Sequence, residues 1–248
     1  MRVILTHFAA PVKKKAFTMS SKPVRRAALA GSLAEQVYRH LRGQIILGQY
    51  PAGEKLVELE LATATGTSQG TVREALQRLE REGLVERQPH RATVVTEINT
   101  DEIYELFAVR STIEGFAVRR AVEYLTDANV QQLAERIEAM RTEGSAGDVI
   151  GLVENDLEFH RLICDWSRSK TLLRAWLPLY AQIQRFIAQT HPQYFGDLVR
   201  VADSHLPVYD ALQRRDADAA VRLMQEHIML IWSWLDDRSG QTDDRAKL

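Results

Sequence analysis

The stretch TVREALQRLEREGLVERQPHRATVV, residues 71–95, changes its hydrophobic pattern at Gly83. Before Gly83, apolar residues recur every three or four positions, which predicts a helix with one buried face. After Gly83, apolar and polar residues alternate, which predicts two short strands that reverse at residues 89–92. Gly83 itself suits the left-handed cap that ends many helices. The sequence therefore predicts a helix that leads directly into a β-hairpin.

The residues before this stretch predict two more helices. Residues 49–56 are expected to form a turn, and residues 57–65 a short helix that stops at Gly66. Ser68 is a good N-cap for the third helix. The expected buried residues of the first helix, which ends near Gly48, are Leu33, Val37, Leu41 and Ile45. Those of the third helix are Val72, Ala75, Leu76 and Leu79. Three helices followed by a hairpin describe a winged helix-turn-helix, which we assign to residues 32–97.

A winged helix-turn-helix predicts double-stranded DNA as a partner. A helix fits the major groove of B-DNA, and the residues at its N-terminal end reach the base edges. Arg73 can donate two hydrogen bonds to a guanine, worth roughly 1 to 3 kcal/mol of base discrimination. Its alternative role is a surface contact with Gln77 or Glu80. His90 and Arg91, near the hairpin tip, are expected to contact the DNA backbone or the minor groove. The candidate DNA-contacting residues are Ser68, Gln69, Gly70, Thr71, Arg73, Gln77, His90 and Arg91.

Residues 33–95 resemble the DNA-binding domain of the GntR family of bacterial transcription regulators. The family pattern VREAL..LE..GLVE is present from Val72 to Glu86. Gln69 to Thr71 stand where the family often has Arg-Thr-Pro, and Ala92 stands where it often has a wing glycine. The resemblance implies a repressor that is released from its operator by an effector. We expect a homodimer on an inverted-repeat operator, since one recognition helix reads too few bases for genomic specificity.

Composition restricts the other classes of protein. The chain has 248 residues and 45% hydrophobic content, enough for a substantial core in one or, as we favour, two domains. No apolar run approaches the roughly 20 residues that cross a bilayer, so no membrane partner is expected. The single cysteine, Cys164, fits a reducing cytoplasm, where we place the protein, and is expected to serve in packing. The net charge is −1, so DNA binding must be local.

The first 31 residues differ from the rest in charge. They include six lysine and arginine side chains between residues 13 and 26, and the first acidic residue of the chain is Glu35. We interpret residues 1–31 as a basic, disordered tail rather than a secretory signal, because the positive cluster follows the short apolar stretch. Met19 leaves open the alternative that translation begins there and that residues 1–18 are not part of the native protein.

After Glu97 the hydrophobic period is helical almost to the end of the chain. Residues 99–102 have a capping sequence, and the long helix that follows is expected to bury Ile103, Phe107, Ile113, Phe116 and Ala117. Further helices are predicted at residues 127–142, 147–168, 170–191, 195–214 and 217–236. The fold class is therefore mainly α. We assign residues 98–237 to an all-helical domain for effector binding and dimerisation, and residues 238–248 to a flexible tail.

Polar residues interrupt the apolar stripes of this helical domain. Asp156 and His160 are four residues apart and share one helix face. His205 and His227 lie on the apolar stripes of two later helices. A single histidine on such a stripe is more often a core residue than a ligand, but three histidines and a carboxylate favour a divalent transition metal such as Zn, Ni or Mn. The spacing also resembles the FCD domain of the FadR branch, where the matching residues bind a metal below an effector pocket.

Charge then indicates the class of effector. Three neutral histidines and one aspartate leave a divalent ion with a surplus of about +1, which a small carboxylate would neutralise. Arg110 can bind a carboxylate through its two-pronged guanidinium, or it can pair with Glu114 four residues later. Arg185 is a weaker candidate for the same role. The sequence thus predicts a carboxylate effector held by the metal and by Arg110.

Two other classes of protein were considered. A metal-dependent hydrolase would use the same metal ligands, but the chain has no HExxH motif, phosphate-binding glycine loop or recognisable nucleophile. An architectural DNA-binding protein without an effector would not need the polar cluster in its helical domain. We therefore expect a regulator and no enzymatic activity.

Overall fold

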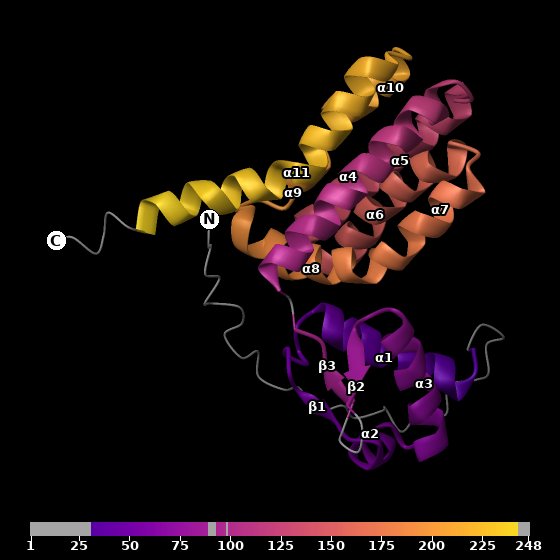
Figure 1. Ribbon diagram of the computed structural model, residues 1–248, viewed down its shortest axis with the longest axis vertical. Helices are drawn as coiled ribbons and strands as arrows, with labels where there is room; N and C mark the ends of the chain where they lie inside the picture. The colour runs from indigo at the N-terminus through magenta and orange to yellow at the C-terminus, as the bar shows by residue number, and fades with distance from the viewer. Residues whose placement is uncertain (1–30, 89–92, 98, 243–248) are drawn as a thin grey trace. The chain divides into compact units, whose positions relative to one another are not determined.

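The computed structural model describes residues 31–88, 93–97 and 99–242 (Figure 1). The described residues form two compact units, one that ends at residue 97 and one that begins at Asn99. None of the helices in these residues combines the length and the apolar character that a membrane span requires. The fold is mainly helical, as predicted, with a winged helix-turn-helix followed by a helical bundle.

The first unit contains the three predicted helices, α1 (Leu33–Ile46), α2 (Glu58–Thr65) and α3 (Gln69–Arg81). Serine caps begin two of them. The Ser32 hydroxyl accepts from the backbone N–H of Glu35 at 3.2 Å, and the Ser68 hydroxyl accepts from that of Thr71 at 3.1 Å. Gly66 ends α2 with a positive φ of 64°, a conformation that costs glycine little.

A three-stranded antiparallel sheet completes this unit, in the order β1-β3-β2. The predicted hairpin strands are present as β2 (Val85–Arg87) and β3 (Thr93–Val95). The prediction of a turn over residues 49–56 was wrong at its end, because Lys55–Leu56 form strand β1. Lys55 pairs with Val94 of β3. Two residues are too few to show an alternating pattern, and their partner lies far along the chain.

The core of the first unit consists of the apolar faces of α1 and α3 and the inner side chains of the sheet. The predicted residues of α3 are all buried, as are Val37, Leu41 and Ile45 of α1. Leu33 was predicted wrongly: it is the first residue of α1 and is 58% exposed. Around the core, Arg42 of α1 pairs with Glu82 at 2.8 Å.

The second unit is a helical bundle. Its elements are α4 (Thr100–Val122), α5 (Asp127–Ala146), α6 (Val149–Trp166), α7 (Lys170–Trp176), η1 (Leu177–Leu179), α8 (Tyr180–Tyr194), α9 (Val199–Asp203), α10 (Leu206–Gln213) and α11 (Ala217–Thr242). α4 packs along α11 and against α6, and α5 packs against α6 and α9 (Figure 1). This arrangement brings α4, α6, α8 and α11 around one interior.

Two predicted helices are divided in the structure. The segment 170–191 forms α7 and α8 with a 3₁₀ turn between them, and Pro178 lies in that turn. The segment 195–214 forms α9 and α10, with Pro207 in the first turn of α10. Proline lacks the N–H that a helix interior requires, so helices tend to begin at it. α11 continues to Thr242, beyond the predicted end at residue 236.

The outer face of α4 also differs from the prediction. Phe116 was expected in the core but is 57% exposed, whereas Ala117, Val118 and Ala121 are fully buried. Val109, two helical turns before Phe116, is 50% exposed. α4 therefore carries an apolar stripe that no described part of the chain covers.

Candidate metal centre and nucleic-acid interface

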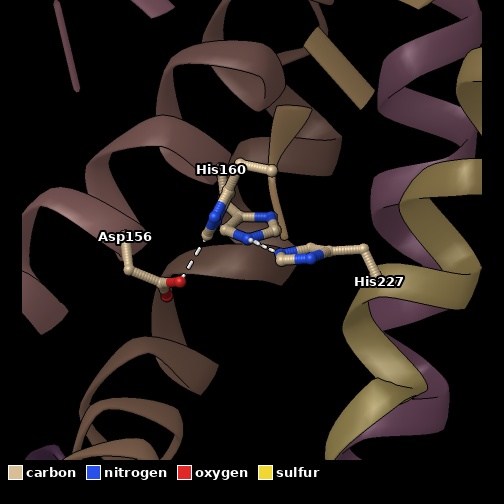
Figure 2. Close-up of side chains that lie close together, drawn as sticks. Asp156, His160 and His227 are labelled. Carbon is tan, nitrogen blue, oxygen red and sulfur yellow. Dashed lines mark hydrogen bonds and ion pairs between the residues drawn. The ribbon is translucent and has the colours of Figure 1, made fainter. Parts of the chain in front are cut away.

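Asp156, His160, His205 and His227 lie together in the interior of the helical unit. One ligand atom from each side chain lies within 4.8 Å of all the others, and all four residues are buried or half-buried. Figure 2 shows Asp156 and His160 pointing from α6 toward His227 of α11. The structure thus brings together, from three regions of the chain, the four residues that the sequence predicted as metal ligands.

Local structure explains these positions. Asp156 and His160 are one helical turn apart, so both side chains leave the same face of α6. His205 lies in the break between α9 and α10, where it is the N-cap residue of α10. The break that Pro207 accompanies therefore places His205 beside the other three residues, rather than only bending a continuous helix.

Hydrogen bonds fix the orientation of two of the imidazole rings. The Nδ1 atom of His205 lies 2.8 Å from the carbonyl oxygen of Val201. A carbonyl oxygen can only accept, so this Nδ1 carries the proton and donates it. The Nδ1 atom of His160 lies 2.5 Å from Oε2 of Glu114, an ionised carboxylate. In the neutral form of both rings, Nε2 carries the free lone pair.

These lone pairs converge in a way that favours a bound cation. The bare Nε2 of His205 lies 3.1 Å from Oδ1 of Asp156, and Nε2 of His160 lies 3.3 Å from Nε2 of His227. Asp156 Oδ2 and His205 Nε2 are buried and have no hydrogen-bond partner. Three imidazole nitrogens and one carboxylate are a donor set that suits Zn, Ni or Mn, so the residues fit a divalent metal.

His227 and His160 are held in the neutral form that binds metals. Burial lowers the pKa of His227 well below 6.5, and the neighbouring His205 and His160 lower it further. Burial also lowers the pKa of His160, although Glu114 acts in the opposite direction. Because a charged imidazole has no lone pair to offer, this neutrality keeps the ring nitrogens available to a cation.

Glu114 supports the cluster from α4. Its carboxylate accepts from Arg110 Nε at 2.8 Å, from Trp176 Nε1 at 2.7 Å and from His160. Burial alone would raise the pKa of Glu114, but the charge of Arg110 and the hydrogen bonds from His160 and Arg110 lower it to about 2. A carboxylate that holds the far side of a metal-binding histidine is a common feature of metal sites. The sequence indicated Glu114 only as a possible ion-pair partner of Arg110, four residues earlier on the same helix.

A cavity of about 390 Å³, including its opening to solvent, adjoins the cluster. Asp156, His160 and His227 line it on one side, and Arg110 of α4 lines it as well. The Arg110 side chain is 2% exposed and pairs with Glu114, which was the alternative role considered for it. This pair leaves Nη2 of Arg110 buried without a partner. Arg110 thus combines an internal ion pair with a free donor at the cavity.

Two residues of α8 differ from the sequence prediction for the effector site. Arg185 is buried on α8, where burial lowers its pKa to about 10, but it is not among the residues that line the cavity. His191, also on α8, does line the cavity and was missed. Burial lowers the pKa of His191 to about 4. The signal that could have found it is its position one turn beyond Ile187 on the inner face of α8.

Cys164 has a packing role, as expected. It is fully buried on α6 in a cluster with Ala117, Leu172 and Trp176. Burial raises the pKa of the Cys164 thiol far above its usual range, so it remains protonated and inert.

The recognition helix α3 presents the predicted DNA-contacting side chains. Gln69, Arg73 and Gln77 are exposed, while the Ser68 hydroxyl and Thr71 are occupied in capping the helix. Arg73 pairs with Glu58 of α2 through two nitrogens, the shorter distance being 2.7 Å, rather than with Gln77 or Glu80. The pair is solvent-exposed and therefore weak enough for DNA to compete with it. His90 and Arg91 lie outside the described residues.

Comparisons with known proteins agree with both units. Residues 33–95 match the model of the bacterial regulatory proteins of the gntR family, and residues 105–229 match the FCD domain. The probable D-xylose utilization operon transcriptional repressor of Paenarthrobacter nicotinovorans is 30% identical over 79% of this chain and 86% of its own length. The HTH-type transcriptional repressor RspR of Escherichia coli is 28% identical over the same shares of the two chains.

A solved structure supports the fold. E. coli McbR/YncC is 23% identical and has a TM-score of 0.69, over 85% of this chain and 100% of that chain. Together with the geometry above, these findings show that the chain belongs to the GntR family, in its FadR-like branch, as a transcriptional regulator with a winged helix-turn-helix and an FCD domain rather than as an enzyme.

Proposed function

We propose that this regulator is a repressor that binds an inverted-repeat operator as a homodimer, and that a small carboxylate effector bound beside a divalent metal controls its DNA affinity. Asp156, His160, His205 and His227 would hold the metal, and Arg110 would bind the effector. When bound, the metal would supply positive charge and open coordination positions for an oxygen ligand. The relative named for a D-xylose utilization operon supports a role in the control of catabolic genes.

The observation that carries this proposal is the convergence of unpaired polar atoms on one cavity. The bare nitrogens of the histidines and Asp156 Oδ2 need a cation, and Arg110 Nη2 needs an acceptor. Buried polar atoms are nearly always paired in native proteins, so several unpaired ones at one cavity indicate bound partners. A metal and an anion together would pair them.

Charge favours a carboxylate over a neutral effector. Arg110 and Glu114 neutralise each other, and Asp156 cancels one of the two charges of a divalent ion. One positive charge then remains in a buried site with largely apolar walls, where an uncompensated charge is costly. A monocarboxylate neutralises it and also offers two oxygens that accept hydrogen bonds from Arg110.

The position of the proposed effector site on α4 suggests how effector binding would change DNA affinity. Arg110 and Glu114 lie on α4, the first helix after the DNA-binding unit in the chain. A change in the position of α4 would alter the separation of the two recognition helices in a dimer, and DNA affinity depends on that separation.

The test is a thermal-shift screen of small acids on metal-loaded and chelated protein, repeated with His205→Ala and with His40→Ala as a control outside the cluster. We expect acids to stabilise the metal-loaded wild type and His40→Ala only, and the same acids to release operator DNA in a gel-shift assay. Stabilisation that survives both chelation and His205→Ala would refute metal-mediated binding. A neutral compound as the only hit would refute the carboxylate.

The uncovered stripe of α4 supports the homodimer. Val109 and Phe116 are seven residues apart, so they lie on one face of the helix, and both are at least half exposed. We propose that a second copy of the chain covers this face. Phe116→Glu should shift the protein from dimer to monomer in sedimentation, whereas Leu177→Glu, on a similarly exposed leucine of η1, should not. A dimer of unchanged stability in Phe116→Glu would place the interface elsewhere.

A further inference from the structure

His191 of α8 is a buried polar group that the proposed metal and effector sites do not use. It is 8% exposed and lines the same cavity as Arg110 and the metal cluster. Its Nδ1 atom is buried and has no hydrogen-bond partner. Because Asp156, His160 and His227 line this cavity too, a ligand in it could contact both His191 and the metal cluster.

None of the other polar groups at the cavity forms a hydrogen bond with Nδ1 of His191. Ser204 is the remaining polar residue of the lining, and its hydroxyl already donates to the carbonyl oxygen of Val201 at 2.6 Å. The ring of His191 packs edge-on against Phe195, at 4.8 Å between the ring centres. The rest of the wall near α8 is apolar, as at Ile187. His191 therefore brings an unpaired Nδ1 to the wall of a cavity that a ligand could fill.

The chemistry of the ring selects the kind of ligand group. A neutral imidazole has one donor and one acceptor nitrogen. A hydroxyl group both donates and accepts, so it can satisfy Nδ1 in either tautomer, whereas a C–H group leaves it unpaired. A second carboxylate would add a negative charge beyond the single positive charge that the proposed site has to offset.

We propose that His191 is a specificity-determining residue that binds a hydroxyl group of the effector, an inference that rests on the proposed carboxylate effector. The effector is then a hydroxylated acid, with its carboxylate at the metal and Arg110 and a hydroxyl at His191. An acid of the same shape without the hydroxyl leaves Nδ1 desolvated and unpaired, and binds more weakly for that reason.

The experiment compares monocarboxylic acids that differ only in hydroxyl groups: gluconate with hexanoate, lactate with propionate, and mandelate with phenylacetate. Affinities are measured by titration calorimetry on metal-loaded wild type, His191→Leu, His191→Asn and Ile187→Val. The leucine variant removes both ring nitrogens, the asparagine variant keeps a donor and an acceptor, and Ile187→Val changes the same wall of the cavity without changing its polarity. Metal content and melting temperature are recorded for each protein.

In the wild type and in Ile187→Val, we expect at least one hydroxylated acid to bind about 10- to 100-fold more tightly than its deoxy partner. In His191→Leu this preference should disappear while the deoxy acid binds as before, and His191→Asn should restore part of it. Unchanged metal content is expected throughout.

Four results would overturn the inference. Deoxy acids that bind the wild type as tightly as their hydroxylated partners would disprove it and leave the carboxylate proposal intact. A preference that persists in both His191→Leu and His191→Asn would assign the hydroxyl to another residue. Loss of metal from His191→Leu would make His191 a metal ligand instead. If no acid binds the wild type, the proposed carboxylate effector fails, and the hydroxyl site fails with it.

Discussion

Replacing Glu114 with glutamine should destabilise the helical unit strongly. The change removes the negative charge that neutralises Arg110 while keeping the shape of the side chain, so it leaves a buried guanidinium uncompensated. Breaking a buried ion pair in this way costs about 3 to 5 kcal/mol. The lowered pKa of Glu114 agrees with a cost of this order. It is lowered from 4.5 to about 2, which at about 1.4 kcal/mol per pH unit corresponds to about 3 kcal/mol.

The assay is thermal and urea unfolding of Glu114→Gln, with Glu105→Gln as the matched control, since Glu105 is an exposed carboxylate on the same helix. A loss of about 3 to 5 kcal/mol should lower the melting temperature by roughly 6 to 20 °C. Metal affinity should fall by about 10- to 100-fold, because His160 loses the carboxylate that holds its Nδ1 proton.

The pH dependence provides a further check. A lowered carboxyl pKa contributes stability that is fully present above the unfolded value of 4.5 and is lost as the pH falls toward about 2. The wild type should therefore exceed Glu114→Gln by the full amount at pH 7, and the difference should shrink below pH 4.5. Equal unfolding midpoints for Glu114→Gln and Glu105→Gln at pH 7, with unchanged metal affinity, would refute the reasoning.

Three further predictions concern the core, the DNA interface and the metal. Leu79 is fully buried in α3, so Leu79→Ala should lower the free energy of unfolding in urea by about 2 to 5 kcal/mol. Leu59 of α2 is 60% exposed, so Leu59→Ala should lower it by less than about 0.5 kcal/mol. Similar losses for the two variants would contradict the assigned core. In gel-shift assays, Arg73→Ala should lose discrimination at one base pair of each half-site, whereas Arg91→Ala should weaken binding to all sequences. If Arg73→Ala weakens binding to operator and random DNA equally, Arg73 contacts only a phosphate. Adding Zn at about 100 times its dissociation constant should stabilise the wild type by about 2.7 kcal/mol and should not stabilise His227→Ala; equal stabilisation of both would exclude His227 as a ligand.

The pattern of the sequence determined most of the secondary structure and the assignment of both units. The helical period ends at Gly83 and alternation follows, so the recognition helix and the hairpin could be predicted from local preferences alone. Asp156, His160 and His227 could be predicted because each is a polar residue on an apolar stripe, and a helical stripe points to the interior whatever it packs against. His205 was predicted from the same pattern, but it reaches the site from the break between α9 and α10.

Contacts between distant segments of the chain decided the features that the sequence pattern did not predict, such as strand β1 and the exposed face of α4. Strand β1 exists because Lys55 and Leu56 pair with β3 some forty positions along the chain. Phe116 is exposed although it lies in an apolar helix, because α11 and α6 cover other faces of α4. Periodicity shows that a helix has apolar faces, but only packing shows which of them is covered.

In the candidate site, too, some features could be predicted from the sequence and others depended on the packing of the helices. The sequence placed Arg110 and Glu114 one turn apart, and only the fold brought His160 and Trp176 to the same carboxylate and buried all four residues. His191 entered the cavity in the same way, through the packing of α8 beside α6. Spacing along one helix is local and can be read from the sequence, whereas the meeting of side chains from α4, α6, α7 and α8 depends on the packing of the whole bundle.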